Sequence, residues 1–370
     1  MIAETIGQKI ARRIRAEGPL SIAAFMTMAL HDPVDGYYAR RQPIGAEGDF
    51  VTAPEISQVF GELIGLWCTV MWRQLGRPDP VILAELGPGR GVLMSDLMRA
   101  AAMVPEFRRA AHLHLVEVSA VLRAEQRERL DKFAPVWVPQ FADLPEGPLL
   151  LVANEFLDAL PIRQFVRGPV HWRERLVGLH DEDRLVLMDG PESPVASLMV
   201  PPAMRDAAQD GVVETCPAAL ALAAALGRHL TRWPGAALFI DYGYFPSAPG
   251  PTLRAFQRHQ PADILEAPGT ADLTADVDFA AFAEAARVGG ANIYGPVLQG
   301  SFFSELGAEL RLAALRARAT PAQRQALDTG VSRLLDPGEM GTLFKAIALV
   351  SPGLPPPPGF GVAGGGATNS

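Results

Sequence analysis

Three glycines and two acids stand at spacings that suit the binding of a nucleoside. Gly87, Gly89 and Gly91 alternate directly after a short apolar run of strand length, and Glu85 precedes them. Glycines at a strand-to-helix turn let a ligand lie against bare backbone, where the N–H groups and dipole of the helix point at it. Glu117 ends a second strand candidate and can accept from both hydroxyls of a ribose. The carboxylate of Glu85 suits a positive amino group better than a pyrophosphate.

The spacing separates this turn from two other nucleotide motifs. A dinucleotide fingerprint needs its third glycine at the position of Val92, and the Gly-Lys-Ser/Thr end of a P-loop is absent. Glu85, Gly87-Pro88-Gly89-Arg90-Gly91 and Glu117 together resemble the S-adenosylmethionine (SAM) site of Rossmann-like methyltransferases. In the alternative interpretation, the glycines only relieve crowding in an ordinary βα turn.

A polar, glycine-rich segment precedes this turn in the chain. It carries Asp49, Thr52, Glu55 and Ser57 just before an expected buried helix. Such a loop can form a lid over a cofactor. The stretch from Thr52 to Glu55 can equally be a capping box, with threonine at the N-cap, proline in the first turn and glutamate at N3.

Acids and an amide also follow two later strand candidates. Residues 149–153 and 236–240 are continuous apolar runs, which are typical of buried parallel strands. The polar residues that follow these runs are Asn154, Glu155 and Asp158 after the first and Asp241 after the second. Because ligands of open parallel sheets bind beyond the carboxyl ends of the strands, we expect these side chains to meet the substrate. Alternatively, Asn154 and Glu155 decorate the N-terminus of a helix.

Two further candidates lie in loops. After a short strand at 136–138, Asp143 can accept from the amino group of an adenine while Leu144 donates its backbone N–H. An ordinary turn acid is an equal alternative for Asp143. His259 lies in the loop-like stretch 253–269 and can act as a base, although a lone loop histidine is more often solvated.

The elements that must position these residues predict an α/β fold. We expect helices at 2–16, 20–31, 93–102, 119–132, 218–232, 272–287, 299–319 and 321–335. We expect strands at 81–86, 113–117, 136–138, 149–153, 236–240, 291–294 and 342–350. We predict a helical cap and cofactor lid (1–75), a core (76–161 and 216–350), an inserted β-rich substrate subdomain (162–215) and a disordered Pro- and Gly-rich tail (351–370).

Composition excludes several other classes of protein. The chain has 370 residues, 49% of them hydrophobic and 20% charged, which predicts a globular protein with an ample core. A net charge of -8 argues against binding nucleic acid by bulk attraction. Cys68 and Cys216 lie far apart, so we expect neither a disulfide framework nor a metal site. No apolar run approaches the length of a membrane span.

Several long motifs extend the resemblance to one family. They are Gly48-Asp49-Phe50-Val51-Thr52-Ala53-Pro54-Glu55-Ile56-Ser57, Glu85-Leu86-Gly87-Pro88-Gly89-Arg90-Gly91, Asn154-Glu155-Phe156-Leu157-Asp158-Ala159-Leu160-Pro161, Ile240-Asp241-Tyr242-Gly243-Tyr244 and Met340-Gly341-Thr342-Leu343-Phe344-Lys345. From about residue 18 to 350 the chain is similar to the MidA family of SAM-dependent methyltransferases. The resemblance implies a Rossmann-like core with a mostly parallel seven-stranded sheet and helices on both faces. It also implies methylation of protein arginine, which in eukaryotic members concerns a core subunit of respiratory complex I.

The resemblance to SAM enzymes also implies roles for the candidate residues. The turn at 87–91 and Glu85 would hold the methionine end of SAM, and Glu117 the ribose. The other cofactor residues would be Thr52, Glu55, Ser57, Asp143, Leu144 and Asn154. The carboxylates expected to grip a guanidinium are Glu155, Asp158 and Asp241.

Alternative functions remain open from the sequence. They are a small-molecule or RNA methyltransferase on the same fold, and an assembly chaperone that retains SAM without turnover. We expect a bacterial cytoplasmic protein, or one of the mitochondrial matrix if the source is eukaryotic. The sequence does not indicate an oligomeric state.

Overall fold

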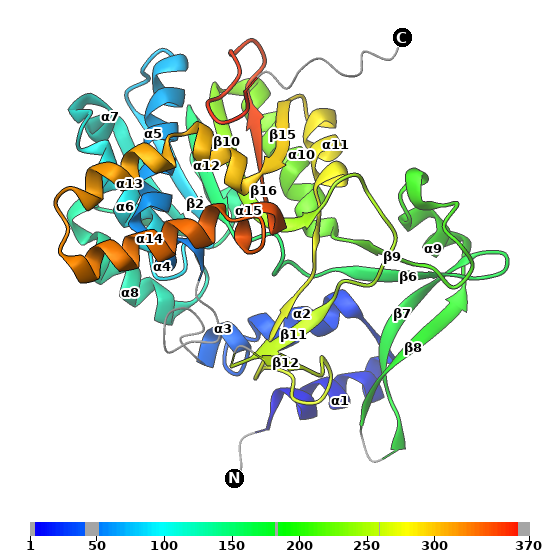
Figure 1. Ribbon diagram of the computed structural model, residues 1–370. Coiled ribbons are helices and arrows are strands. Elements are labelled where there is room, and N and C mark those ends of the chain that lie inside the picture. The colour runs from blue at the N-terminus through cyan, green and yellow to red at the C-terminus, as the bar shows by residue number, and fades with distance from the viewer. Residues whose placement is uncertain (1–3, 41–51, 182–183, 259, 362–370) are drawn as a thin grey trace.

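The computed structural model describes residues 4–40, 52–181, 184–258 and 260–361 (Figure 1). A large twisted sheet with helices on both faces forms the body, and a smaller β-rich part lies beside it together with the N-terminal helices. The predicted α/β class is therefore confirmed. In the described ranges, no helix is both long and apolar enough to cross a membrane.

The main sheet follows one path of seven described strands. Their order is β15 (Asn292–Leu298), β16 (Phe344–Val350), β10 (Gly235–Tyr244), β5 (Leu149–Asn154), β2 (Val81–Leu86), β3 (Ala111–Val116) and β4 (Val136–Val138). The five strands from β4 to β10 pair in parallel, whereas β16 pairs antiparallel to both of its neighbours. An eighth described strand, β14 (Val277–Asp278), extends the end of β10 in parallel. The carboxyl ends of β2, β5 and β10 therefore lie side by side.

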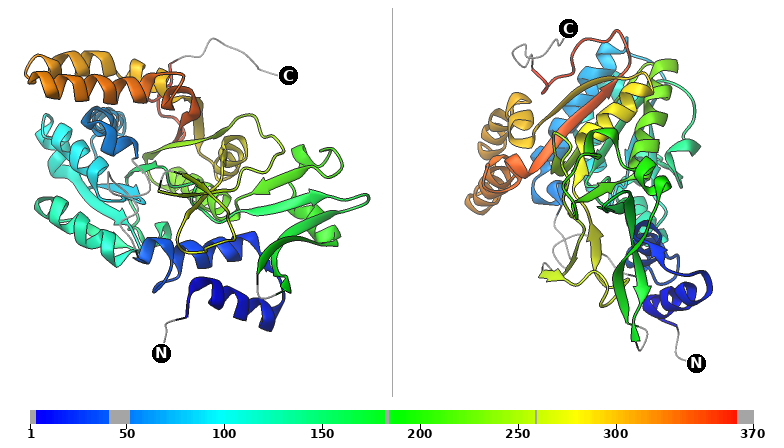
Figure 2. Two further views of the ribbon diagram at one scale, coloured as in Figure 1. Left: turned by 60° about the horizontal axis from the view of Figure 1, so that its bottom comes forward. Right: turned by 90° about the vertical axis from the view of Figure 1, so that its right-hand side faces the viewer.

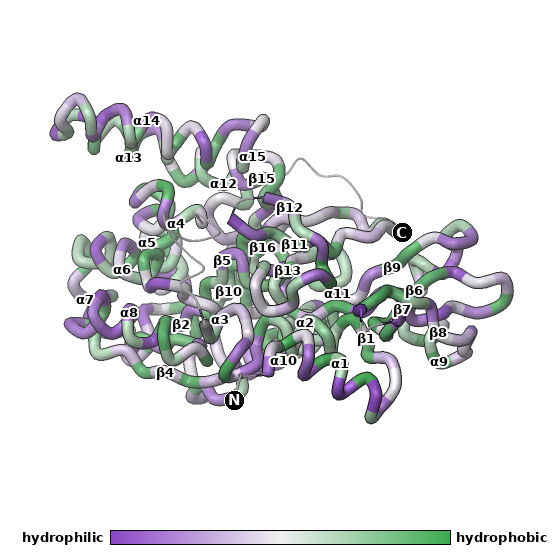
Figure 3. The backbone as a smooth tube through the Cα atoms, turned by 90° about the horizontal axis from the view of Figure 1, so that it is seen from below, coloured by the Kyte–Doolittle hydropathy of each residue, from purple (hydrophilic) through white to green (hydrophobic). Residues whose placement is uncertain are grey.

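Alternating side chains of these strands feed two hydrophobic cores. On one face, Leu83, Leu150 and Leu238 pack with α5 (Gln58–Gln74), α6 (Val92–Ala101), α12 (Gln299–Glu305) and α14 (Pro321–Leu335). On the other face, neighbouring strand residues pack against α10 (Pro217–Arg232) and α11 (Phe279–Val288). Smaller helices of the first face are α7 (Pro105–Ala110), α8 (Ala120–Leu130), α13 (Ala308–Arg316) and α15 (Met340–Leu343). Figure 3 shows hydrophobic residues concentrated along the central strands, whereas hydrophilic residues recur along the projecting α13 and α14.

The β-rich part contains two smaller sheets and the N-terminal helices (Figure 2). One sheet contains β1 (Leu20–Ser21), β7 (Trp172–Leu179), β6 (Arg163–Arg167), β9 (Val212–Thr215) and β8 (Leu185–Glu192), with α9 (Pro194–Met199) beside β7. The other contains β12 (Gln260–Ala262), β11 (Arg254–Gln257) and β13 (Asp272–Thr274). Helices α1 (Ile6–Glu17) and α2 (Ile22–His31) share a third core with both sheets, and α3 (Tyr37–Arg40) follows. The insertion 162–215 thus shares its sheet with β1 from the N-terminus.

The structure corrects two sequence predictions in this region. The stretch 253–269 is a loop only in part, because β11 within it pairs with both β12 and β13. The helix predicted from 272 begins at Phe279, because the side chain of Asp278 accepts the Ala281 N–H at 2.9 Å as its N-cap. The residues expected to begin this helix instead form β13 and β14. Hydrophobic periodicity in the sequence did not reveal the strands β11 to β14, because each of them has only two to four residues.

The beginning of the predicted disordered tail is packed. Phe360 is 5% exposed and its ring lies 5.2 Å from that of Phe302. Ser351 accepts the Gly235 N–H at 2.8 Å, which anchors the chain where β16 ends. Disorder was therefore a wrong prediction for 351–361, since a Pro- and Gly-rich composition hides the single aromatic anchor. Residues 362–370 lie outside the described residues.

Helices α10 and α11 cross at a contact between two glycines, which gives a test of this packing. A Cβ added to Gly227 would lie 2.8 Å from the Cα of Gly289 and would also meet the carbonyl oxygen of Ala286. We expect Gly227→Ala to lower the free energy of unfolding by about 1–3 kcal/mol, because backbone must move. Gly7→Ala on α1 is the matched control, since its Cβ would have no neighbour closer than 3.9 Å. Denaturant unfolding of both variants measures the difference, and equal stability would contradict the packing described.

Candidate active site

The turn between β2 and α6 is built on left-handed backbone. Gly87, Gly89 and Gly91 have φ angles of 60°, 50° and 75°, a region that favours glycine. A Cβ on Gly87 would lie 2.8 Å from the ring of Phe156. The Gly91 N–H donates to the Pro88 carbonyl at 2.7 Å, and Gly91 serves as the N-cap of α6. The predicted strand, tight turn and helix are thereby confirmed.

One pocket gathers segments that are far apart in the sequence. Its empty volume, which includes space open to solvent, is about 380 Å³. The residues that line it are Thr52, Pro54, Glu55, Glu85, Gly87, Pro88, Gly89, Arg90, Val92, Leu93, Asn154 and Glu155. Eight of the residues proposed for the site from sequence are in this set. Those proposed residues that do not line it are Ser57, Gly91, Glu117, Asp143, Leu144, Asp158 and Asp241.

Two buried acids stand behind the turn. Glu85 is 3% exposed, and its Oε2 atom has no hydrogen-bond partner among the described residues. Burial, followed by repulsion from Glu117, raises the pKa of Glu85 to about 8. Burial also raises the pKa of Glu117, although its oxygens accept the Ser119 N–H at 2.7 Å and the Gln126 side-chain amide at 3.3 Å. The two acids are therefore near enough to act on one another.

Gln126 joins the turn to Glu117, a role that sequence reasoning missed. Its amide nitrogen donates to the Gly89 carbonyl at 2.6 Å, and its oxygen accepts the indole N–H of Trp137 at 2.8 Å. The signal available in the sequence was the spacing of Leu122, Gln126 and Leu130, which places the glutamine on the buried face of α8. A fully buried glutamine with several partners fixes the shape of the cavity behind the glycines.

The described end of the lid segment lies over the pocket. Thr52 is the N-cap of α4 (Ala53–Ile56), but its side chain makes no capping hydrogen bond, so the capping-box interpretation was wrong. Ser57 instead caps α5 by accepting the Val59 N–H, which gives it a structural contact. Glu55 pairs with Arg90 at 3.7 Å, across the pocket mouth. Asp49 lies outside the described residues.

The end of β5 carries the most crowded part of the site. Glu155 has a φ of 50°, and its Oε1 accepts the Ala53 N–H at 3.1 Å and the Asn154 amide at 2.9 Å. Burial, followed by repulsion from Asp158, raises the pKa of Glu155 to about 7. Residues 156–162 form no helix, so the interpretation of Asn154 and Glu155 as a decorated helix start was wrong.

Asp241 and Asp158 lie behind Glu155. Asp241 is 1% exposed, and its Oδ2 accepts the backbone N–H groups of Phe156 at 3.1 Å and Leu157 at 2.9 Å. Its Oδ1 accepts the N–H of Tyr242 at 2.9 Å, so both of its oxygens already accept hydrogen bonds from backbone N–H groups. Burial and the carboxylates of Asp158 and Glu155 raise the pKa of Asp241. Its contacts therefore hold the loop after β5 in place.

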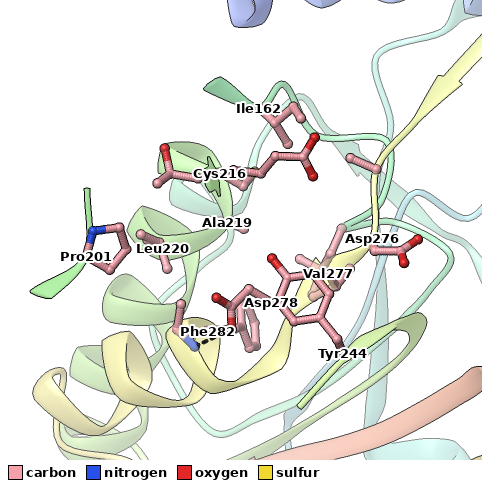
Figure 4. A pocket seen from close by; sticks show the side chains of 15 residues that line it. Ile162, Pro201, Cys216, Ala219, Leu220, Tyr244, Asp276, Val277, Asp278 and Phe282 are labelled. Atoms are coloured by element: carbon pink, nitrogen blue, oxygen red, sulfur yellow. Dashed lines mark hydrogen bonds between the residues drawn. The ribbon is translucent and has the colours of Figure 1, made fainter. Parts of the chain in front are cut away.

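Asp143 and Leu144 do not line the pocket. Asp143 is exposed, and its Oδ1 accepts from Gln140 at 3.3 Å. The Leu144 N–H, which was expected to donate to an adenine, already donates to the Phe141 carbonyl at 3.1 Å. His259 lies outside the described residues. A separate pocket between α10 and α11 contains none of the proposed site residues (Figure 4).

The unpartnered atoms around the pocket share one chemistry. Among the described residues, three buried oxygens on lining residues have no hydrogen-bond partner: Glu55 Oε1, Glu85 Oε2 and Asn154 Oδ1. A fourth, Asp158 Oδ1, belongs to a residue that does not line the pocket but whose charge acts on the lining residue Glu155. All four are acceptors on carboxylates or an amide, and buried acceptors are normally paired. No group of described His, Cys, Asp or Glu residues is arranged to hold a metal ion. The site therefore fits ligands that bring N–H donors and positive charge, as the ammonium of SAM does.

Comparisons with known proteins identify the family of this chain. A family model described as a putative S-adenosyl-L-methionine-dependent methyltransferase matches residues 63–297. Protein arginine methyltransferase NDUFAF7, mitochondrial, from Xenopus tropicalis is 36% identical, with 94% of this chain and 87% of the relative covered. The Mus musculus protein of the same name is 37% identical, with 91% and 82% covered. A COG1565 superfamily protein from Burkholderia thailandensis, solved with S-adenosyl-homocysteine, aligns with a TM-score of 0.82, 29% identity and coverage of 97% and 94%. The chain thus belongs to this family and is a SAM-dependent methyltransferase.

Proposed function

We propose that this enzyme transfers the methyl group of SAM to an arginine side chain of a protein. The observation that carries the proposal is the set of buried, unpartnered acceptors on Glu55, Glu85, Asn154 and Asp158. Guanidinium and ammonium groups are the side-chain cations that such acceptors bind best. The relatives from frog and mouse are named protein arginine methyltransferases, which supports the same choice of substrate.

The residues around the turn suit the cofactor. When bound, SAM supplies a methyl group on a sulfonium centre that a nitrogen can attack. In our assignment, Glu85 accepts from the ammonium, while the backbone of 87–91 lies against the methionine end. Glu117 accepts hydrogen bonds from the ribose hydroxyls through the carboxylate lone pairs that are not used by its bonds to Ser119 and Gln126. That Asp143 accepts from the amino group of the adenine stays a prediction. Leu144 is no longer assigned to the adenine, because its N–H already donates to Phe141.

The acids after β5 and β10 divide the work on the substrate. We assign Glu155 to grip the guanidinium, because it lines the pocket and its Oε1 is already fixed by the Ala53 N–H. Guanidinium has a pKa above 12, so a proton must leave the nitrogen once it carries the methyl group. In our assignment the Oδ1 atom of Asp158, which has no hydrogen-bond partner among the described residues, accepts this proton. Asp241 acts indirectly, by holding the loop that carries both acids.

The architecture supports the finer fold and domain assignments as proposals. In the path from β4 to β15 only β16 runs opposite to the others, which suits a Rossmann-like methyltransferase core with seven principal strands. We retain residues 162–215 as the substrate-binding subdomain. By the family resemblance, a complex I core subunit is the candidate substrate, in a bacterial cytoplasm or a mitochondrial matrix.

The methyl-transfer assay separates this proposal from its alternatives. Purified enzyme and radiolabelled SAM are incubated with protein and RNA fractions from cells that lack the enzyme. We expect label in protein, at arginine by mass spectrometry. Label in RNA or in small molecules would contradict the arginine proposal, and absence of any transfer would favour the chaperone alternative.

We predict that SAM binding becomes tighter as pH rises from 6 to 8. In the free protein Glu85 has a pKa of about 8, so at pH 7 it is mainly protonated and must release its proton to pair with an ammonium. Glu85→Gln should weaken binding about 10- to 100-fold near pH 8, where an α-amino group is still partly protonated, and should remove the proton release expected near pH 7. Calorimetry in buffers of different ionisation enthalpy measures both quantities. Exposed Glu128→Gln on α8 is the matched control, and unchanged proton release in Glu85→Gln would refute the assignment.

We predict that Glu155→Gln spares SAM binding and lowers methyl transfer by about 10²-fold or more. The amide keeps the shape of the side chain but cannot pair its charge with a guanidinium. In the wild type, transfer should rise between pH 6 and 8, because the Glu155 carboxylate with a pKa of about 7 must be ionised. Calorimetry and the labelling assay measure the two effects. Normal turnover by the variant would remove Glu155 from the mechanism.

A further inference from the structure

A tyrosine holds one oxygen of Asp158. The hydroxyl of Tyr242, on β10, donates to Asp158 Oδ2 at 2.5 Å. Asp158 is 6% exposed, and its Oδ1 has no partner among the described residues. An O–H bond to a carboxylate is short and strong when the acceptor is ionised. The phenol therefore decides which carboxylate oxygen is engaged and which is left for a ligand.

The ring of Tyr242 is held on two sides. Phe344, on β16, meets it edge to face, with centroids 5.4 Å apart and an interplanar angle of 77°. The guanidinium of Arg254, on β11, lies over the ring at 5.4 Å from its centroid. Asp276 forms an ion pair with Arg254 and so keeps it there. A cation over the ring face withdraws electron density, which makes the hydroxyl a better donor.

Charged and titratable groups from several elements surround Asp158. They are Glu155 in the same loop, Asp241 and Tyr242 on β10, Arg254 on β11, and Tyr38 on α3, whose hydroxyl donates to Asp272 on β13 at 3.0 Å. The neighbouring acids oppose a charge on Asp158, whereas Tyr242 and Arg254 favour it. With these contacts, the pKa of Asp158 is raised by burial to about 6. The carboxylate is therefore ionised at neutral pH only with the help of its donors.

We propose that Tyr242 is a positioning residue for methyl transfer, which occupies Asp158 Oδ2 and so presents an ionised Oδ1 to the guanidinium of the substrate. This inference rests on the proposed function, in which Asp158 takes the proton from the methylated nitrogen. Tyr242 lies within one of the family motifs, but sequence reasoning assigned it no role of its own. The distinguishing contact is with a residue more than eighty positions away in the chain.

The test is Tyr242→Phe, which keeps the ring against Phe344 and Arg254 and removes the hydroxyl. The labelling assay is run on the protein fraction from cells that lack the enzyme, between pH 6 and 9. We expect the pKa with which Asp158 enters the acid limb of kcat to rise by about one to two pH units, the value of one hydrogen bond to a charged group, and so to reach or pass the limb that Glu155 sets near pH 7. Transfer would fall about 5- to 50-fold near pH 6, where about half of the wild-type Asp158 is ionised, and much less at pH 9. The affinity for SAM should not change.

Two further variants make the result decisive. Tyr244→Phe is the matched control, since Tyr244 lies two residues along the same strand and faces the separate pocket (Figure 4), and its pH profile should match the wild type. Arg254→Gln should shift the profile in the same direction as Tyr242→Phe. A wild-type profile for Tyr242→Phe, or an equal loss at every pH, would overturn the inference. Failure of the wild type to label arginine would instead contradict the proposed function.

Discussion

The structure depends on bringing several buried carboxylates together at one end of the sheet. Glu85, Glu155, Asp158 and Asp241 come from β2, from the loop after β5 and from β10, and burial raises the pKa of each. Such an arrangement is costly because charges lose water and repel one another. A cation that enters the pocket offsets both effects. The chemistry of the ligand is therefore implied by the scaffold itself, before any particular substrate is considered.

Backbone and amide contacts make this arrangement possible. Asp241 binds the N–H groups that follow β5, and Gln126 ties the Gly89 carbonyl to Glu117. These contacts come from elements that the parallel sheet already places next to each other, so little extra chain is needed. They also leave selected oxygens without partners. Glu85 Oε2 and Asp158 Oδ1 are two of these, and in our proposal the first binds the cofactor and the second the substrate.

Sequence reasoning found the parts of the site that are encoded locally. The glycines at 87–91 and the acids after apolar runs each carry a signal within a few residues. The structure places Gly87, Gly89 and Glu155 in the lining of one pocket, whereas Asp158 and Asp241 lie outside that lining. Sequence reasoning missed Gln126 and Tyr242, whose roles consist of contacts with distant segments. The sheet of β11, β12 and β13 was missed for the same reason, since very short strands are defined by their pairing. Asp241 was expected to contact the substrate, but both of its oxygens accept hydrogen bonds from backbone N–H groups. The residue type alone does not show whether an aspartate binds a ligand or the backbone.

Because the acids have raised pKa values, the pocket also links ligand binding to the stability of the fold. The ordinary pKa of the Glu85 carboxyl is 4.5, and burial raises it to about 8 in the folded protein. Between these pH values the folded state keeps a proton that the unfolded chain has lost. The contribution of Glu85 to stability is fully present below pH 4.5 and is lost as pH rises through 8. A cation that pairs with the ionised carboxylate lowers this pKa and restores the lost stability. The free energy of ligand binding therefore includes removal of the destabilisation that the buried Glu85 carboxylate causes in the ligand-free protein at neutral and basic pH. On this argument the cofactor is part of what makes the acidic end of the sheet stable, as well as the source of the methyl group.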